Sequence, residues 1–220
     1  QALWDIKGKH YGMPVYEMLG GAVRSRIRMY CGAGGASPEE AAASALARMG
    51  QGFTAVKTSV DAPCRTIDTM AYVERHANRL SAMREAVGKD VDIAIDFHGR
   101  VSPPMAIRLA KALEPHYPMF IEEPCLPENV DTMARIAQST TIPIAAGERV
   151  FTRWGFRELL EKQALSVAQP DLCHAGGVFE ARKIAAMAEV YYAAVAPHNP
   201  LGPISLAACL QLDACTPNFL

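Results

Sequence analysis

Residues 91–100 read VDIAIDFHGR, an apolar run that ends in an aspartate and a histidine directly before a glycine. The β-branched and aromatic residues of this run predict a strand over 91–97 that leads into a turn. Successive side chains of a strand alternate between its two faces, so Asp96 and His98 should point the same way and lie within reach of each other. Taken alone, the stretch is also compatible with a surface turn in which both side chains are solvated.

Short apolar or β-rich runs like this one recur along the chain. The others lie at 26–31, 54–58, 118–122, 142–146, 165–169 and 193–197. Amphipathic, alanine-rich stretches between them predict helices at 38–50, 66–87, 103–114, 128–139, 155–163 and 177–190. Ser37 and Pro38, followed by two glutamates, form a typical helix start. Strand followed by helix, repeated this often, indicates a parallel α/β fold.

Polar residues fall at the C-terminal ends of five of these runs, about one strand–helix unit apart. They are Asp96, Glu122, Glu148, Asp171 and His198. An open doubly wound sheet would lead successive strands away from one point, whereas a closed barrel brings all strand ends to one mouth. We therefore predict a (β/α) barrel of the TIM type, forming one domain over residues 1–220.

Three of these strand-end residues are carboxylates from consecutive strands. Unpaired, Asp96, Glu122 and Glu148 would repel one another, and a divalent cation such as Mg²⁺, which prefers carboxylate oxygens, resolves this repulsion. In the FIEEP stretch either glutamate could be the ligand, and the spacing favours Glu122 over Glu123. The alternative is that these acids form salt bridges with neighbouring arginines, namely Arg100 and Arg149.

The composition narrows the classes of function. Net charge is −1, with 22 basic and 23 acidic residues and no basic stripe, so we expect no nucleic-acid partner. No apolar run approaches the length of a membrane span, so we expect no membrane partner. The six cysteines form no CxxC pair and predict reduced thiols in a cytoplasmic protein.

The motifs DFHGR, FIEEP, AAGER, QPDLCHAGG and APHNPLGP together resemble the mandelate racemase subgroup of the enolase superfamily. The opening ALWDIKGKHYGMPVYEMLGG is similar to the helix that enters the barrel in that subgroup, so the resemblance spans essentially the whole chain. It implies an enolase-type barrel and a Mg²⁺ cofactor. The chain ends in sequence that looks like the opening of strand eight, so we expect the capping domain and most of the last strand to lie outside this sequence.

The reaction implied by the resemblance begins with removal of the proton next to a substrate carboxylate. Family members of the racemase branch carry a Lys-x-Lys pair on strand two, but here the stretch reads Lys57-Thr58-Ser59. Lys57 could still bind the substrate carboxylate, whereas Ser59 cannot act as a base near neutral pH. Arg100 and Arg149 are further candidates for substrate binding.

Two histidines are then left to move protons. Asp171 should bond one ring nitrogen of His198 and leave the other free as the general base for the C2 proton. His98 would meet the substrate from the opposite side and protonate the departing 3-hydroxyl. His174, near the predicted mouth, is interpreted as structural, Cys125 as a bystander thiol, and His76 as a surface residue.

These roles imply an acid-sugar dehydratase that forms a 2-keto-3-deoxy acid, with D-galactonate as the expected substrate. The full-length protein is expected to be a homo-oligomer. Three alternatives stay open: dehydration of another hexonate or pentonate, a histidine-based racemase or epimerase, and a barrel kept for binding without catalysis.

Overall fold

The computed structural model describes residues 1–61 and 64–220. They divide into two compact units: a middle unit, Met29–Ala145, and a terminal unit formed by Gln1–Arg28 and Ala146–Leu220. Both units alternate helices with short parallel strands. The expectation of one domain over residues 1–220 stays a prediction.

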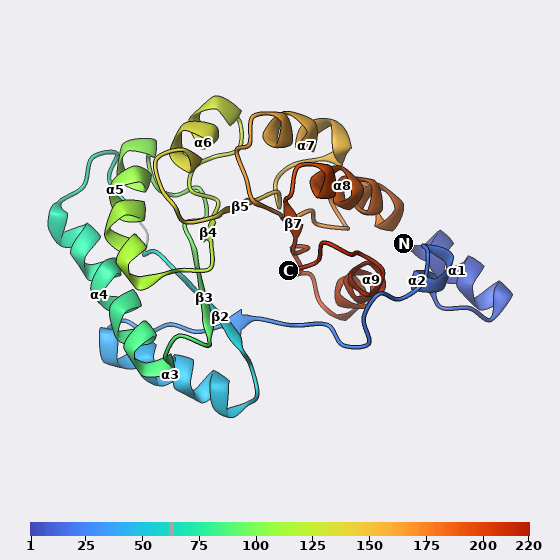
Figure 1. Cartoon of the computed structure of the whole chain (residues 1–220), viewed down its shortest axis with the longest axis horizontal. Helices are drawn as coiled ribbons and strands as arrows, with labels where there is room; N and C mark the ends of the chain where they lie inside the picture. The colour runs from blue at the N-terminus through green and yellow to red at the C-terminus, as the bar shows by residue number, and fades with distance from the viewer. Residues whose placement is uncertain (62–63) are drawn as a thin grey trace. The chain divides into compact units, whose positions relative to one another are not determined.

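The middle unit carries strands that pair in parallel in chain order, from β1 beside β2 through to β4 beside β5. Helices α3, α4 and α5 lie along one side of its strands (Figure 1). The strands are β1 (Cys31–Gly32), β2 (Ala55–Ser59), β3 (Asp92–Asp96), β4 (Ile121–Glu122) and β5 (Ile144–Ala146). The helices are α3 (Pro38–Gly50), α4 (Met70–Val87), α5 (Pro103–Leu113), η1 (Glu114–His116) and α6 (Val130–Ala137).

The terminal unit contains the two ends of the sequence. Its strands β6 (Val167–Ala168) and β7 (Ala194–Val195) pair in parallel. Its helices are α1 (Ala2–Tyr11), α2 (Val15–Met18), α7 (Thr152–Glu161), α8 (Val178–Val190) and α9 (Pro203–Ala214). The last residues run beside β7, where Val195 N–H donates to Asn218 O and Leu220 N–H donates to Val195 O. Val195 and Phe219 form an isolated parallel bridge there.

Local sequence explains why these elements form. The Ser37 side chain accepts from Glu40 N–H, and the Glu40 carboxylate accepts from Ser37 N–H, which completes a capping box at the start of α3. The apolar residues of β3 and the inner face of α5 are buried and form part of the core of the middle unit. Those with no exposed surface are Ile93, Ala94, Met105, Ala106, Leu109 and Leu113.

One predicted strand is shorter than expected, and one helix was missed. Of the predicted run 26–31, only Cys31 lies in a strand, because β1 (Cys31–Gly32) begins pairing with β2 at the register Cys31–Val56. Helix α9 was not predicted at all. Its stretch ISLAACLQL is apolar with little polar alternation, so no helical periodicity distinguished it from a buried strand.

His76 corrects a third expectation, because it is 2% exposed rather than a surface residue. It lies on the inner face of α4, where its ring meets Tyr72 edge-on with centroids 4.7 Å apart. Burial lowers the pKa of His76 to about 4, the nearby Asp61 carboxylate opposes this shift, and Arg79 adds to it.

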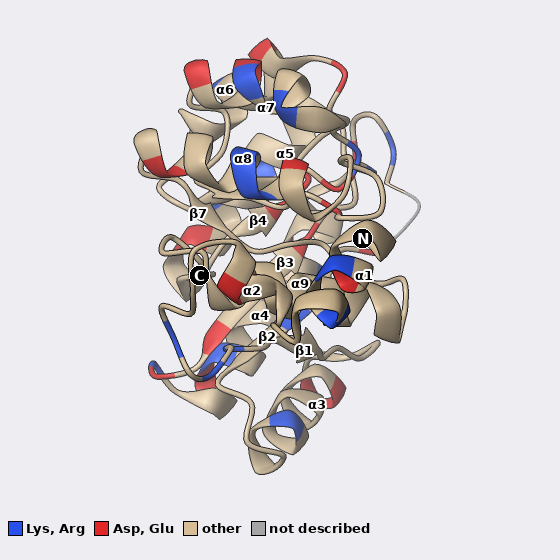
Figure 2. Cartoon of the chain, turned by 90° about the vertical axis from the view of Figure 1, so that its right-hand side faces the viewer, with Lys and Arg blue, Asp and Glu red and all other residues tan. Residues whose placement is uncertain are grey.

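Charged residues of both signs are spread along the chain, as the sequence indicates. Figure 2 shows acidic and basic residues interspersed along the ribbon. None of the helices in the described part of the chain is long and apolar enough to cross a membrane. The six cysteines all lie among the described residues, and no disulfide joins any of them.

Gly147 generates a first prediction, because it follows β5 with φ at 141°. A Cβ there would lie 2.7 Å from the ring of buried Phe156 and 3.0 Å from the backbone of Gln169. We expect Gly147→Ala to lower the free energy of unfolding by about 2–4 kcal/mol, measured by urea denaturation. Gly50→Ala is the control, since a Cβ at Gly50 meets nothing within 4 Å. Equal stability of the two variants would contradict the crowding at Gly147.

His76 generates a second prediction, which concerns acid stability. Below pH about 6.5 the unfolded histidine takes up a proton, whereas the folded one stays neutral until pH about 4. Stability should therefore be complete above pH 6.5 and fall by about 2 kcal/mol on going from pH 7 to pH 5. His76→Phe keeps the ring contact with Tyr72 and should remove this part of the acid dependence. The test is urea denaturation at both pH values, and an unchanged pH dependence in the variant would contradict the assignment.

Candidate active site

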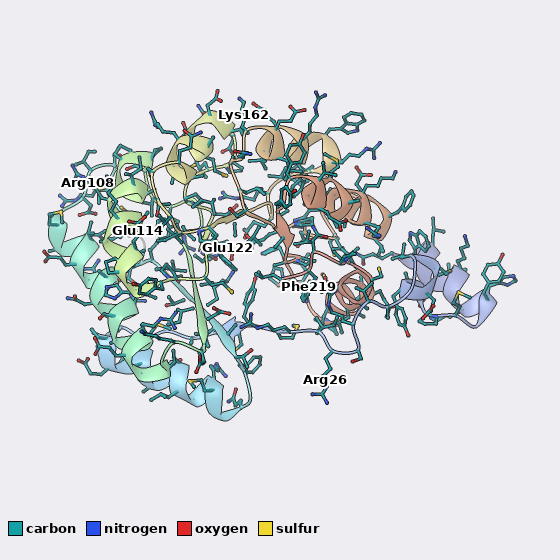
Figure 3. The ribbon with its side chains drawn as sticks, in the orientation of Figure 1. Arg26, Arg108, Glu114, Glu122, Lys162 and Phe219 are labelled. Carbon is teal, nitrogen blue, oxygen red and sulfur yellow. The ribbon has the colours of Figure 1, made fainter. Side chains whose placement is uncertain are left out.

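Asp96 and Glu122 are the last residues of neighbouring parallel strands, β3 and β4. They stand opposite each other in the strand register and are 1% and 0% exposed. Glu122 lies at the strand layer of the middle unit, on the side away from α4 and α5 (Figure 3). Because parallel strands end at the same edge of a sheet, the two carboxylates meet there as the sequence predicts.

Lys57, from β2, forms ion pairs with both carboxylates. Its Nζ lies 2.7 Å from Glu122 Oε2 and 3.3 Å from Asp96 Oδ2. Burial by itself lowers the pKa of Lys57, but Glu122, Tyr30 and Asp96 together raise it above its usual value. Burial and the charge of Glu122 raise the pKa of Asp96, against the opposing effect of Lys57 and His98. Lys57 is therefore a charged lysine that partly balances two buried acids.

The Lys57 contacts revise the alternative interpretation, in which the acids form salt bridges with arginines. Asp96 and Glu122 do form ion pairs, but their partner is Lys57 rather than Arg100. Arg100 is exposed and lines a hollow of about 480 Å³ together with Gly99 and buried Cys125. Arg149, in the terminal unit, is half-buried.

The donor set at these two strand ends fits a hard divalent cation. Glu122 Oε1 is buried without a hydrogen-bond partner, so one carboxylate oxygen remains available as a ligand. Among the described residues no group of three or more His, Cys, Asp or Glu side chains is placed to hold a metal ion. Glu148, the third predicted ligand, belongs to the terminal unit, and its role beside Asp96 and Glu122 stays a prediction. Neighbouring Glu123 is 2% exposed, so it does not face solvent.

His98 lies within reach of Asp96, but for a different reason from the one inferred from the sequence. Strand β3 ends at Asp96, and His98 sits in the following turn with a left-handed φ of 52°. Its backbone N–H donates to Asp96 Oδ1 at 2.7 Å, and its ring Nδ1 lies 3.0 Å from Asp96 Oδ2. The His98 side chain is 41% exposed. A turn held by the aspartate, and not strand alternation, thus places the histidine.

Asp171 and His198 form the expected pair in the terminal unit. His198 Nδ1 lies 2.8 Å from Asp171 Oδ2, and the aspartate is fully buried. The N–H groups of Cys173 and His174 donate to Asp171 Oδ1, which orients the carboxylate toward the ring. A carboxylate only accepts hydrogen bonds, so Nδ1 carries the proton and Nε2 is left with its lone pair when the ring is neutral.

Nε2 of His198 faces the carboxylate of Glu148, whose Oε2 lies 3.4 Å away. The two ring nitrogens of His198 thus face two carboxylates, Asp171 at Nδ1 and Glu148 at Nε2.

The sequence indicated a structural role for His174 but not which residue it supports. Its ring lies 4.0 Å from Asp171 and 6.5 Å from the ring of Phe151, and the side chain is 45% exposed. Its backbone N–H supports Asp171, which agrees with a structural role. The signal for this support was the DLCH spacing, because an aspartate commonly accepts from N–H groups two and three residues later.

The sequence of this chain matches a known protein family and several named relatives. The model of the family described as "Enolase C-terminal domain-like" matches residues 40–220. A protein of Ralstonia pickettii named D-galactonate dehydratase is 52% identical over 213 residues, which cover 97% of this chain and 56% of that protein. A protein of the same name from Klebsiella pneumoniae is 49% identical, with the same coverage. This chain therefore spans about half the length of these relatives.

Solved structures are similar over nearly the whole chain. A member of the enolase superfamily from Salmonella typhimurium superimposes with a TM-score of 0.95 at 38% identity, covering 100% of this chain and 62% of that one. A mandelate racemase/muconate lactonizing enzyme-like protein from Rubrobacter xylanophilus gives a TM-score of 0.93 at 39% identity, covering 99% and 62%.

Proposed function

This chain belongs to the Enolase C-terminal domain-like family, and we propose that the protein is a magnesium-dependent acid-sugar dehydratase, a hydro-lyase, with D-galactonate as its substrate. The membership confirms the predicted fold class, a (β/α) barrel of the enolase type. The observation that carries the proposal is the presence of two histidines, His98 and His198, each bonded to a buried aspartate. The name shared by the relatives supports the choice of substrate.

The first step is removal of the C2 proton, which we assign to His198. The proton is weakly acidic, so the base must be oriented and its protonated form stabilised. Asp171 supplies both effects through its 2.8 Å contact with Nδ1. Asp96, Glu122 and Glu148 are the residues that would hold Mg²⁺, whose charge stabilises negative charge on the substrate carboxylate when the ion is bound.

The second step is loss of the 3-hydroxyl, which we assign to His98. A hydroxide ion leaves poorly, so the oxygen must take up a proton as its bond to C3 breaks, and water is released. Asp96 stabilises the charged imidazolium through Nδ1, and the partly exposed ring leaves Nε2 to donate. The electron pair of the broken C2–H bond forms the C2–C3 double bond of an enol, which becomes the 2-keto-3-deoxy acid.

Substrate binding is assigned to Lys57, Arg100 and Arg149, whose positive charges suit the carboxylate of a sugar acid. Ser59 stands in register with Asp96 at the end of β2, where a racemase of this superfamily would carry a second lysine. Its presence favours elimination over racemisation by a lysine. Another hexonate or pentonate, a histidine-based racemase and a non-catalytic barrel are outcomes that the experiments below distinguish.

Location and assembly belong to the same proposal. Six cysteines without a disulfide support a reducing, cytoplasmic environment. Partners are proposed to be the small sugar acid and further copies of the same chain.

The metal assignment predicts dependence on a divalent cation. Stripping the intact protein with a chelator should abolish dehydration of D-galactonate, and adding Mg²⁺ or Mn²⁺ should restore it, because Asp96 and Glu122 prefer hard cations. The measurement is release of the 2-keto acid. Unchanged turnover in excess chelator would contradict a metal at these carboxylates.

The two histidines should separate in their effects on the two steps. His198→Asn should abolish both dehydration and exchange of the C2 proton with solvent deuterium. His98→Asn should block dehydration and leave C2 exchange detectable. Each loss should be about 10²–10⁴ in rate, or roughly 3–5 kcal/mol, as for one positioned acid or base.

Three results would contradict this assignment or redirect it. A His98 variant that dehydrates normally, together with a His198 variant that still exchanges C2, would show that the roles are wrong. A wild-type protein that inverts C2 and releases no keto acid would be a racemase. Absence of both reactions with every sugar acid tested would favour a barrel that only binds.

A further inference from the structure

Glu180 lies in the first turn of α8, but its carboxylate caps a different helix, α7. Its Oε1 accepts a hydrogen bond from Arg153 N–H at 2.9 Å, and its Oε2 accepts from Arg153 Nη1 at 2.7 Å. Arg153 is the second residue of α7, and the residue before that helix, Phe151, provides no side-chain hydrogen bond. The Glu180 side chain is 14% exposed. The first turn of α7 is therefore held by an acceptor from the neighbouring helix.

The start of α7 needs such an acceptor, because its own residues fit poorly there. Thr152, the first residue of the helix, has a left-handed φ of 57°, which a β-branched residue rarely adopts. The first N–H groups of a helix have no partner within it, and Ser, Thr, Asp or Asn at the preceding position usually accepts from one of them. A phenylalanine side chain cannot accept such a bond, and Glu180 takes over this role from outside the helix.

The segment that leads into α7 carries Glu148. It comprises residues 147–151, between β5 and α7, and its Val150 N–H donates to Gly147 O at 3.0 Å. Glu148 Oε2 lies 3.4 Å from His198 Nε2. Because the segment is short, a shift of the first turn of α7 would move the Glu148 carboxylate relative to the histidine ring.

The stem of Glu180 also contacts the segment that carries Asp171. A Cβ on Gly176 would lie 3.2 Å from Cβ and Cγ of Glu180, so this glycine, with φ at 112°, allows the turn before α8 to pack on the glutamate. Glu180 thus links the turn after Asp171 to the helix start after Glu148. These two carboxylates face the two ring nitrogens of His198.

The ion pair between Glu180 and Arg153 is the weaker part of their contact. The Arg153 side chain is 33% exposed, and a partly exposed ion pair contributes little to stability. Its guanidinium carbon also lies 4.9 Å from the centre of the Trp154 ring, so the charge of Arg153 has a second partner. The bond to Arg153 N–H, in contrast, depends on how far the Glu180 side chain reaches.

We infer that Glu180 is a positioning residue for Glu148 in the proposed elimination. Its bond to Arg153 N–H fixes the start of α7, and with it the preceding residues 147–151. The inference rests on the proposed function in assigning Glu148 as a ligand of Mg²⁺, and it adds the residue that keeps this ligand in place. The reach of the Glu180 carboxylate, and not its charge, carries the effect.

Three substitutions separate reach from charge. Glu180→Asp keeps the charge but shortens the side chain by a methylene group, and Glu180→Gln keeps the length but loses the charge. Arg153→Met removes the ion pair but keeps the N–H group. In the intact protein, Mg²⁺ binding is measured by isothermal titration calorimetry, and hydrogen–deuterium exchange of residues 147–156 is measured by mass spectrometry.

Glu180→Asp should bind Mg²⁺ about tenfold more weakly than wild type, as expected when the support of a metal ligand is lost. Its residues 147–156 should exchange about tenfold faster, because the start of α7 opens locally, while exchange in α3 of the middle unit stays unchanged. Glu180→Gln and Arg153→Met should stay within about threefold of wild type in both measurements.

Wild-type behaviour of Glu180→Asp in both measurements would overturn the positioning role. Losses of the same size in Glu180→Gln or Arg153→Met would also overturn it, because the charge of the ion pair would then account for the effect. Equally fast exchange in α3 would overturn it as well, since the variant would have lost stability throughout. A wild-type protein that binds no Mg²⁺ would overturn the metal assignment of the proposed function, and the exchange measurements would then decide the positioning role alone.

Discussion

Two carboxylates buried at the ends of neighbouring parallel strands impose the main constraint on this protein. Asp96 and Glu122 are almost without exposure, so water cannot screen their charges, and cationic or hydrogen-bonding groups of the protein must do so. Lys57 contacts both acids, while His98 contacts Asp96 through its backbone and its ring. The turn that follows β3 and the charge state of Lys57 follow from this requirement, and Glu122 Oε1 is the one oxygen of the pair left without a hydrogen-bond partner.

The two histidine–aspartate pairs differ in ways that suit different proton-transfer roles. Asp171 is held by two backbone N–H groups and presents its other oxygen to His198 at 2.8 Å, while the His174 ring lies farther away at 4.0 Å. Asp96 instead serves His98 and Lys57 together, and its histidine is more exposed to solvent. A ring fixed by a dedicated carboxylate suits a base, whereas a partly exposed ring beside a shared carboxylate suits an acid that exchanges protons with water.

Membership of the family establishes the fold, but the chemistry is argued from particular side chains, because one fold supports many reactions. Ser59 in register with Asp96 removes the lysine base that a racemase of this type would use. Glu148 Oε2 lies 3.4 Å from Nε2 of His198, the ring nitrogen opposite the one that contacts Asp171.

The sequence by itself determined the alternation of strands and helices, the capping box at Ser37 and the register that places Asp96 beside Glu122. Each depends on local spacing: the period of a strand, the length of one strand–helix unit, or the preference of a helix start. Only the tertiary structure decided that Lys57 shares both acids, that His98 sits in a left-handed turn and that His76 is buried. Residue spacing predicts which side chains share a face, but the partner of a buried charge depends on distances between strands and helices far apart in the chain.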